Sequence, residues 1–335
     1  MKRIEWLDFA KGISIFMVVL GHTLREIYTH NLYLNYDKYL VIIADIIFLF
    51  AMPVFFALSG YLFKPLNSWR EYKFFIRKKA INLLIPYVIF SILYVCLQHI
   101  GTAKNLQSWG SLLLIWYRPI SYLWFLYTLF FIFVIVGYFS VINISIKKQV
   151  IIYLGMFLIT QIVSIPSGVS FSLMWIFFFY LGVLCKKYLF ILENKVFEIS
   201  SILICIVLVF VDFNVVGIYA DYNFPHLWNF IPKVLIVLIS MMCFEHCPRN
   251  KIFKYYKKYG VYSLIVYLVH EPVISIVRTL ILHVVHPNIV FMFLLLFFSG
   301  WYISIFAVYL NKKVKFINII FSPYKYFKES RIINE

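Results

Sequence analysis

Four ionisable residues, Asp8, Lys11, His22 and Glu26, are spaced along a segment that is otherwise strongly apolar. Each residue of an α-helix advances by 100°, so Lys11 and His22 lie on nearly one face, with Asp8 and Glu26 within about 60° of them. The rise from Lys11 to His22 is roughly 16 Å, about half of a membrane's hydrocarbon core. Ionisable groups in a spanning helix commonly mark substrate or ion pathways, so this stripe predicts a polar track into the protein.

The chemistry that this stripe permits is proton transfer. A neutral histidine accepts a proton near physiological pH, so His22 is suited to act as a general base. Glu26, one helical turn further on, is placed to orient the imidazole ring. Two structural interpretations remain open, because an intramembrane histidine also bonds across helix interfaces and Lys11 also suits a snorkelling lysine at the membrane surface.

The elements that must position these residues are membrane helices. The 335 residues are 63% hydrophobic and 13% charged, which excludes an ordinary soluble domain. Apolar stretches of spanning length predict an all-α polytopic membrane protein with one ten-helix domain over residues 1–311 and a short basic cytoplasmic tail over 312–335. The expected spans are 11–28, 40–63, 80–98, 122–142, 149–165, 169–185, 197–217, 227–244, 261–282 and 289–310.

The net charge of +17 is distributed as in a membrane protein rather than a nucleic-acid-binding protein. Most of the 31 basic residues fall on one side of these ten spans if the N-terminus is cytoplasmic. Positively charged loops stay preferentially on the cytoplasmic side, so both termini are expected there, and no nucleic acid is expected as a partner.

Two further segments carry polar groups beside predicted spans. Arg77, Lys78 and Lys79 form a dense cationic cluster, expected at the inner mouth of the span over 80–98. Ser59 and Gly60, which follow Pro53, predict a close backbone approach where a helix borders a cavity. The span over 261–282 contains a further group, His270-Glu271-Pro272.

Several of these segments resemble the acyltransferase family 3 membrane proteins, which include O-acetyltransferases of bacterial surface polysaccharides. The first-span pattern of that family is a basic residue, ten residues and a histidine, which Lys11 and His22 match. Similar segments follow in the family's order over nearly the whole chain: Asp8-Phe-Ala-Lys11-Gly12, Met52-Pro53…Ser59-Gly60-Tyr61, Leu84-Ile-Pro86-Tyr87, Leu123-Trp124-Phe125-Leu126 and Tyr267-Leu-Val-His270. One position departs, because many relatives carry Arg-x-x-Arg before the Leu-Leu-Ile-Pro run, whereas this chain has Lys79-Ala-Ile-Asn82.

The resemblance implies a multi-pass enzyme of the bacterial plasma membrane that transfers an acyl group, usually acetyl, from acetyl-CoA to a hydroxyl of a surface glycan or of its lipid-linked precursor. Acetyl-CoA is then a co-substrate, no tightly bound cofactor or metal is expected, and the partners are acyl-CoA, the acceptor and membrane lipid. The implied roles are catalysis for His22 and Glu26, donor binding for Lys11, Arg77, Lys78 and Lys79, and cavity lining for Asp8, Ser59, Trp124, His270 and Glu271.

A transporter or flippase for a glycan or small molecule is the alternative reading of the intramembrane charges, which would then form a proton relay. The residues in question are His22, Asp45, Asp212, Lys233, Glu271 and Arg278. No inverted repeat is evident in the sequence, and this favours the acyltransferase.

Overall fold

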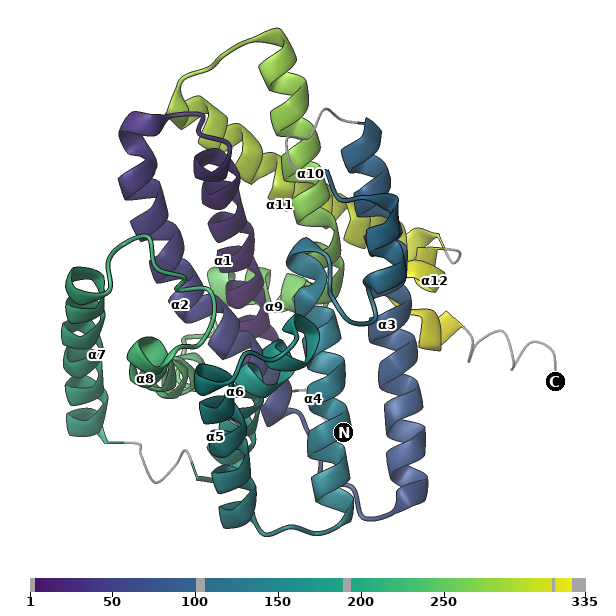
Figure 1. Cartoon of the computed structure of the whole chain (residues 1–335), viewed down its shortest axis with the longest axis vertical. Helices are drawn as coiled ribbons and strands as arrows, with labels where there is room; N and C mark the ends of the chain where they lie inside the picture. The colour runs from purple at the N-terminus through teal and green to yellow at the C-terminus, as the bar shows by residue number, and fades with distance from the viewer. Residues whose placement is uncertain (1–3, 101–105, 189–193, 315–316, 327–335) are drawn as a thin grey trace, which may run out of the picture. The chain divides into compact units, whose positions relative to one another are not determined.

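A computed structural model of the chain describes residues 4–100, 106–188, 194–314 and 317–326. All regular structure in this part of the chain is helical, which confirms the all-α prediction (Figure 1). The α-helices are α1 (Glu5–Thr29), α2 (Asp37–Tyr61), α3 (Trp69–Ile100), α4 (Trp124–Val141), α5 (Ile146–Ile162), α6 (Ser167–Tyr188), α7 (Lys195–Val215), α8 (Leu227–Glu245), α9 (Lys251–Gly260), α10 (Ser263–Val284), α11 (Ile289–Lys313) and α12 (Asn318–Phe321). Short 3₁₀ turns are η1 (Leu34–Tyr36), η2 (Trp109–Leu114) and η3 (Ser121–Leu123).

Nine helical segments among the described residues are long and apolar enough to cross a membrane, and they agree with nine of the predicted spans. The remaining predicted span, 149–165, corresponds to α5, which has 17 residues and does not belong to this set. The chain is therefore a multi-pass membrane protein, and the cytoplasmic location of its termini stays a prediction.

Helix α3 extends beyond the element expected from hydropathy. The helix expected to begin near residue 80 begins at Trp69, so Arg77, Lys78 and Lys79, expected just before the span, lie within α3. Its start is fixed locally, because the backbone N–H of Glu71 donates to Ser68 Oγ (3.2 Å) while the Glu71 carboxylate accepts from the N–H of Asn67 (2.9 Å). Lysine, arginine and glutamate are good helix formers, so a hydropathy minimum does not end the helix.

The contacts within the chain define two compact units, each described here by itself. The first unit comprises Met1–Phe63, Phe177–Ser263 and Val284–Trp301, and the second comprises Lys64–Ile176, Leu264–His283 and Tyr302–Glu335. The domain boundaries expected from the sequence, at 1–311 and 312–335, stay a prediction, and residues 327–335 of the tail lie outside the described part.

In the first unit, α1 packs against α2, α8 and α9 (Figure 1). Glycines permit the closest helix crossings. A Cβ at Gly60 of α2 would collide with the carbonyl group of Phe179 on α6, and one at Gly182 of α6 would collide with that of Ala57 on α2. The close approach predicted for Ser59-Gly60 is thus present, and it is of the small-residue kind common in membranes.

In the second unit, α3 packs along α4 and the short helix α12 lies on α3. Aromatic rings fill the space between these elements. Trp124 at the start of α4 is buried and stacks on Trp175 of α6, with ring centroids 5.9 Å apart. Phe321 of α12 packs against Phe90 of α3, so part of the predicted tail belongs to this helical core.

Candidate active site

The four residues of the predicted polar stripe all lie on α1, a single helix of 25 residues. Asp8 is buried with 6% of its surface exposed, while Lys11, His22 and Glu26 are half-buried. Because the helix is continuous from Glu5 to Thr29, the spacing assumed from the sequence holds over the whole stripe.

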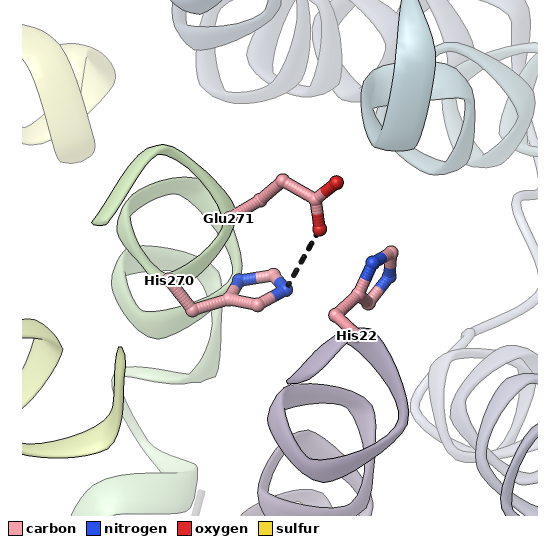
Figure 2. A group of neighbouring side chains, drawn as sticks. All are labelled: His22, His270 and Glu271. Atoms are coloured by element: carbon pink, nitrogen blue, oxygen red, sulfur yellow. Dashed lines mark ion pairs between the residues drawn. The ribbon is translucent and has the colours of Figure 1, made fainter. Parts of the chain in front are cut away.

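His22 lies in the C-terminal half of α1, and Figure 2 shows its side chain projecting from that helix. Its ring meets the ring of Phe48 on α2 edge to face, with centroids 5.5 Å apart. Gly21 allows this approach, because a Cβ there would press on the side chains of Phe48 and Ile47. The packing of α2 therefore restricts the orientation of the imidazole.

Glu26 is held toward the end of α1. Its carboxylate Oε2 lies 3.9 Å from Nδ1 of His30, and that same nitrogen lies 2.9 Å from the Glu26 carbonyl oxygen. His30 is thus a second imidazole within reach of Glu26, which the sequence reasoning did not consider. The proposed role of Glu26 toward His22 stays a prediction.

Ser59 of α2 is half-buried, and its hydroxyl donates to the carbonyl oxygen of Phe55 in the preceding turn (3.1 Å). Serine hydroxyls commonly bond back to the helix in this way. Its oxygen lone pairs remain available to accept hydrogen bonds, so its predicted place in a cavity wall is compatible with this geometry.

The cationic cluster of α3 is unevenly exposed. Arg77 and Lys78 are exposed, whereas Lys79 is half-buried with Nζ 3.7 Å from the centroid of the Phe133 ring. The cluster therefore offers two charges directly to solvent and a third that is held by an aromatic ring.

Residues of the C-terminal segment complete this surface of α3, which the sequence did not predict. The backbone N–H of Tyr324 donates to Oδ1 of Asn82 (3.3 Å), and the Lys78 ammonium lies 5.3 Å from the centroid of the Tyr324 ring. Asn82 is the residue that departs from the family pattern, and here its amide holds the segment that follows α12. No signal in the sequence links positions that are so far apart.

His270 and Glu271 are neighbours on α10, with the Glu271 carboxylate turned toward the His270 ring (Figure 2). The Nε2 atom of His270 lies 3.9 Å from Oε2 of Glu271, and His270 has no exposed surface. Nδ1 lies 3.0 Å from the Val266 carbonyl oxygen, so in a neutral ring it carries the proton and Nε2 carries the lone pair.

The surroundings of His270 are fixed by η3 and α10. Tyr122 donates its hydroxyl to the Leu268 carbonyl oxygen (2.9 Å), and the hydroxyl of Tyr267 donates to the Tyr122 carbonyl oxygen. The Tyr122 ring lies edge to face against His270, with centroids 5.8 Å apart. A buried imidazole with one nitrogen satisfied and a carboxylate near the other has the chemistry of a proton acceptor.

A separate group of polar residues is buried among α2, α7, α8 and the loop before α8. Lys233 of α8 is fully buried and donates from Nζ to the Tyr222 carbonyl oxygen (2.6 Å), and the charges of Asp45 and Asp221 act on it. Burial raises the pKa of Tyr222 to about 12, and the charges of Asp212 and Asp45 act in the same direction. The sequence indicated this group only through Lys233, a lysine inside a predicted span. It could not show which residues surround the lysine side chain.

The fold and these residues define a polytopic helical membrane protein with ionisable side chains held inside its helices. Comparison with known families identifies it further: residues 4–310 match the acyltransferase domain that defines a family of such proteins, and the chain belongs to this family. The predicted resemblance is confirmed.

Two curated proteins are similar to this chain, and both are named nodulation protein NolL. The protein of Mesorhizobium japonicum (strain LMG 29417 / CECT 9101 / MAFF 303099) is 28% identical over 137 residues, which cover 41% of this chain and 36% of that protein. The protein of Sinorhizobium fredii (strain NBRC 101917 / NGR234) is 39% identical over 80 residues, which cover 24% of this chain and 21% of that protein. The matches thus span about a third or less of these relatives, and no solved structure matches the chain.

Proposed function

We propose that this protein is a membrane O-acyltransferase that moves an acetyl group from acetyl-CoA to a hydroxyl of a cell-surface glycan or its lipid-linked precursor. The observation that carries the proposal is the family match over residues 4–310, within which the basic residue and the histidine of the family pattern fall on the polar stripe of α1. The proposed location is the bacterial plasma membrane.

In the proposed reaction, the acceptor hydroxyl attacks the thioester carbonyl of the donor. A carbon–oxygen bond forms, the carbon–sulfur bond breaks, and the thiolate leaves with coenzyme A. His22 takes the hydroxyl proton as general base and returns a proton to the thiolate. The second route is a transient acyl-histidine, in which His22 attacks first and the acceptor then receives the acyl group.

Donor binding is proposed for the cationic residues. Coenzyme A carries several phosphate charges, and the exposed Arg77 and Lys78 supply positive charge to attract them. Arginine can bind a phosphate with two parallel hydrogen bonds, so it compensates for the asparagine at position 82. Lys79 and Lys11 are half-buried and are proposed to hold the donor further from bulk water.

The remaining polar residues are proposed to line the path of the acceptor. Glu26 is proposed to orient a catalytic imidazole, and Asp8, Ser59 and Trp124 are proposed wall residues. His270 and Glu271 form the second imidazole–carboxylate group, and Nε2 of His270 is proposed to accept a proton in the reaction.

The test is acetyl transfer from labelled acetyl-CoA to glycan in washed membranes that contain the protein. We expect His22→Ala to lower the rate by about 10²- to 10⁴-fold, the usual contribution of a general base. His30→Ala is the control, since His30 directly follows the same helix and its Nδ1 bonds to a carbonyl oxygen of that helix. Transfer that persists unchanged in a normally inserted His22→Ala protein would contradict the proposed base.

A second comparison addresses α10. His270→Ala is expected to slow transfer, whereas His283→Ala is not, because both rings bond through Nδ1 to the carbonyl oxygen four residues earlier but His283 is exposed. Label retained on a peptide containing His22 after rapid quenching would select the acyl-histidine route. Movement of a substrate across the bilayer without consumption of the donor would instead select the transporter reading.

A further inference from the structure

The short helix α9 presents two different faces. Phe253 and Gly260 are buried against α1, where Phe253 stacks on Phe9 with ring centroids 4.6 Å apart. A Cβ at Gly260 would collide with the Asp8 carbonyl oxygen, and a Cβ at Gly12 would collide with that of Tyr256. These two glycines bring the backbones of α1 and α9 into direct contact.

The opposite face of α9 carries two parallel stripes. Lys251, Lys254 and Lys258 are exposed and lie within about 60° of one another around the helix axis. Beside them lies an apolar stripe that includes Ile252, 62% exposed, and Tyr255, 37% exposed. A cationic stripe that borders an apolar one is the pattern of a helix lying in the surface of a membrane.

The charge of this segment is unbalanced. Residues 246–262 contain five lysines and arginines and no aspartate or glutamate. Lys257 is compensated, since its Nζ lies 2.7 Å from Oε1 of Glu5 on α1. The three lysines of the exposed stripe therefore form a local excess of positive charge that faces away from α1.

The chain neighbours of α9 indicate that it lies at a membrane surface. Its chain neighbours, α8 and α10, are both candidate membrane spans, so the ten residues of α9 lie where two spans end. Anionic phospholipids attract lysines at such a surface, and the apolar stripe fits the boundary between headgroups and acyl chains.

We propose that the exposed face of α9 is a binding surface for anionic phospholipid headgroups. The phosphates interact with Lys251, Lys254 and Lys258, while Ile252 and Tyr255 contact the upper part of the acyl chains. Because the other face is packed on α1 through Gly12 and Gly260, lipid bound to α9 stabilises the pair formed with the helix that carries Lys11 and His22. The proposal does not depend on the acyl-transfer activity.

The test compares the full-length protein in nanodiscs of phosphatidylcholine alone and of phosphatidylcholine mixed with phosphatidylglycerol. We expect phosphatidylglycerol to raise the thermal midpoint of the wild-type protein, since a ligand that binds only the folded state stabilises it. The triple variant Lys251→Gln/Lys254→Gln/Lys258→Gln should lose this increase and retain fewer phosphatidylglycerol molecules in native mass spectrometry. Glutamine has a helix propensity close to that of lysine, so α9 should persist.

The matched control removes three exposed lysines elsewhere, with Lys147→Gln/Lys148→Gln/Lys195→Gln, and should keep the wild-type increase. If the triple variant does not fold, Lys254→Gln alone should still give a smaller increase than the wild type. The proposal is overturned if the control loses the increase equally, or if the α9 variant keeps both the bound lipid and the increase. It is also overturned if free coenzyme A in phosphatidylcholine nanodiscs reproduces the lysine-dependent stabilisation, because the surface would then bind the donor.

Discussion

Replacement of Lys233 by methionine should destabilise the first unit strongly, because the buried groups that face the Lys233 ammonium would lose its charge and its hydrogen bond. The Lys233 ammonium has no exposed surface, and it donates to the Tyr222 carbonyl oxygen at 2.6 Å. The negative charges that act on it belong to Asp45 of α2, 7% exposed, and Asp221 of the loop before α8. The methionine side chain fills a similar volume but supplies neither the charge nor the hydrogen bond.

The expected cost follows from these contacts. Loss of a hydrogen bond to a charged group accounts for about 1.5–3 kcal/mol. The buried Asp45 would also lose the attraction of the ammonium, so the total cost should exceed the loss of the hydrogen bond alone. In Asp45→Asn/Lys233→Met both charges are absent, so this double variant should recover part of that loss, with a coupling of about 1–3 kcal/mol.

The measurement is the free energy of unfolding in mixed detergent micelles for the wild type, both single variants and the double variant. Lys38→Met is the control, because Lys38 is an exposed lysine on α2 and such substitutions usually change stability by less than about 0.5 kcal/mol. The reasoning fails if Lys233→Met costs no more than Lys38→Met. It also fails if the effects of Asp45→Asn and Lys233→Met are simply additive.

Two further predictions concern His226, which precedes α8, and Tyr324, which follows α12. Burial lowers the pKa of His226 below its usual value, the charge of Asp221 opposes this shift, and the charge of Lys233 adds to it. The unfolded chain therefore binds a proton at this histidine at higher pH than the folded chain does. The stability of the folded state should consequently fall as the pH drops from about 7 to about 5. Thermal midpoints measured across this range should decline less steeply for His226→Gln than for the wild type. Tyr324→Ala should raise the KM for acetyl-CoA by about two- to fivefold with little change in kcat, because the Lys78–ring contact contributes about 0.5–1 kcal/mol.

Each of these predictions has its own control. A pH dependence of His226→Gln that matches the wild type would mean that other groups titrate in this range. For Tyr324, the comparison is Tyr309→Ala, since Lys313 lies 4.7 Å from the Tyr309 ring in a similar cation–π contact distant in sequence from Lys78. An equal rise in KM for both tyrosine variants would show that Tyr324 does not act through Lys78.

The sequence predicted those features that depend on local periodicity. The stripe on α1 follows from helix geometry alone, and α8, expected at 227–244, is observed at Leu227–Glu245 because Glu245 and the residues after it end the apolar run. Helix α9 was not predicted, since ten residues with four lysines do not give a span-length apolar signal. Its start depends on Asn250, whose side chain accepts from the Phe253 N–H (2.9 Å), and its position depends on Gly12 and Gly260, a pairing distant in sequence.

The histidines show why residue type alone could not separate structural from chemical roles. In five of them Nδ1 lies within hydrogen-bond distance of the carbonyl oxygen four residues earlier in the chain, namely His30, His99, His246, His270 and His283. This bond satisfies one nitrogen by purely local geometry and directs the other nitrogen away from the helix backbone. Of these five residues, His270 alone is fully buried. The other four rings are exposed or half-buried, so water can reach their Nε2 atoms. For the buried His270, the protein or a bound substrate must satisfy Nε2. The same local bond therefore has different consequences, and burial selects His270 as the residue to test beside His22.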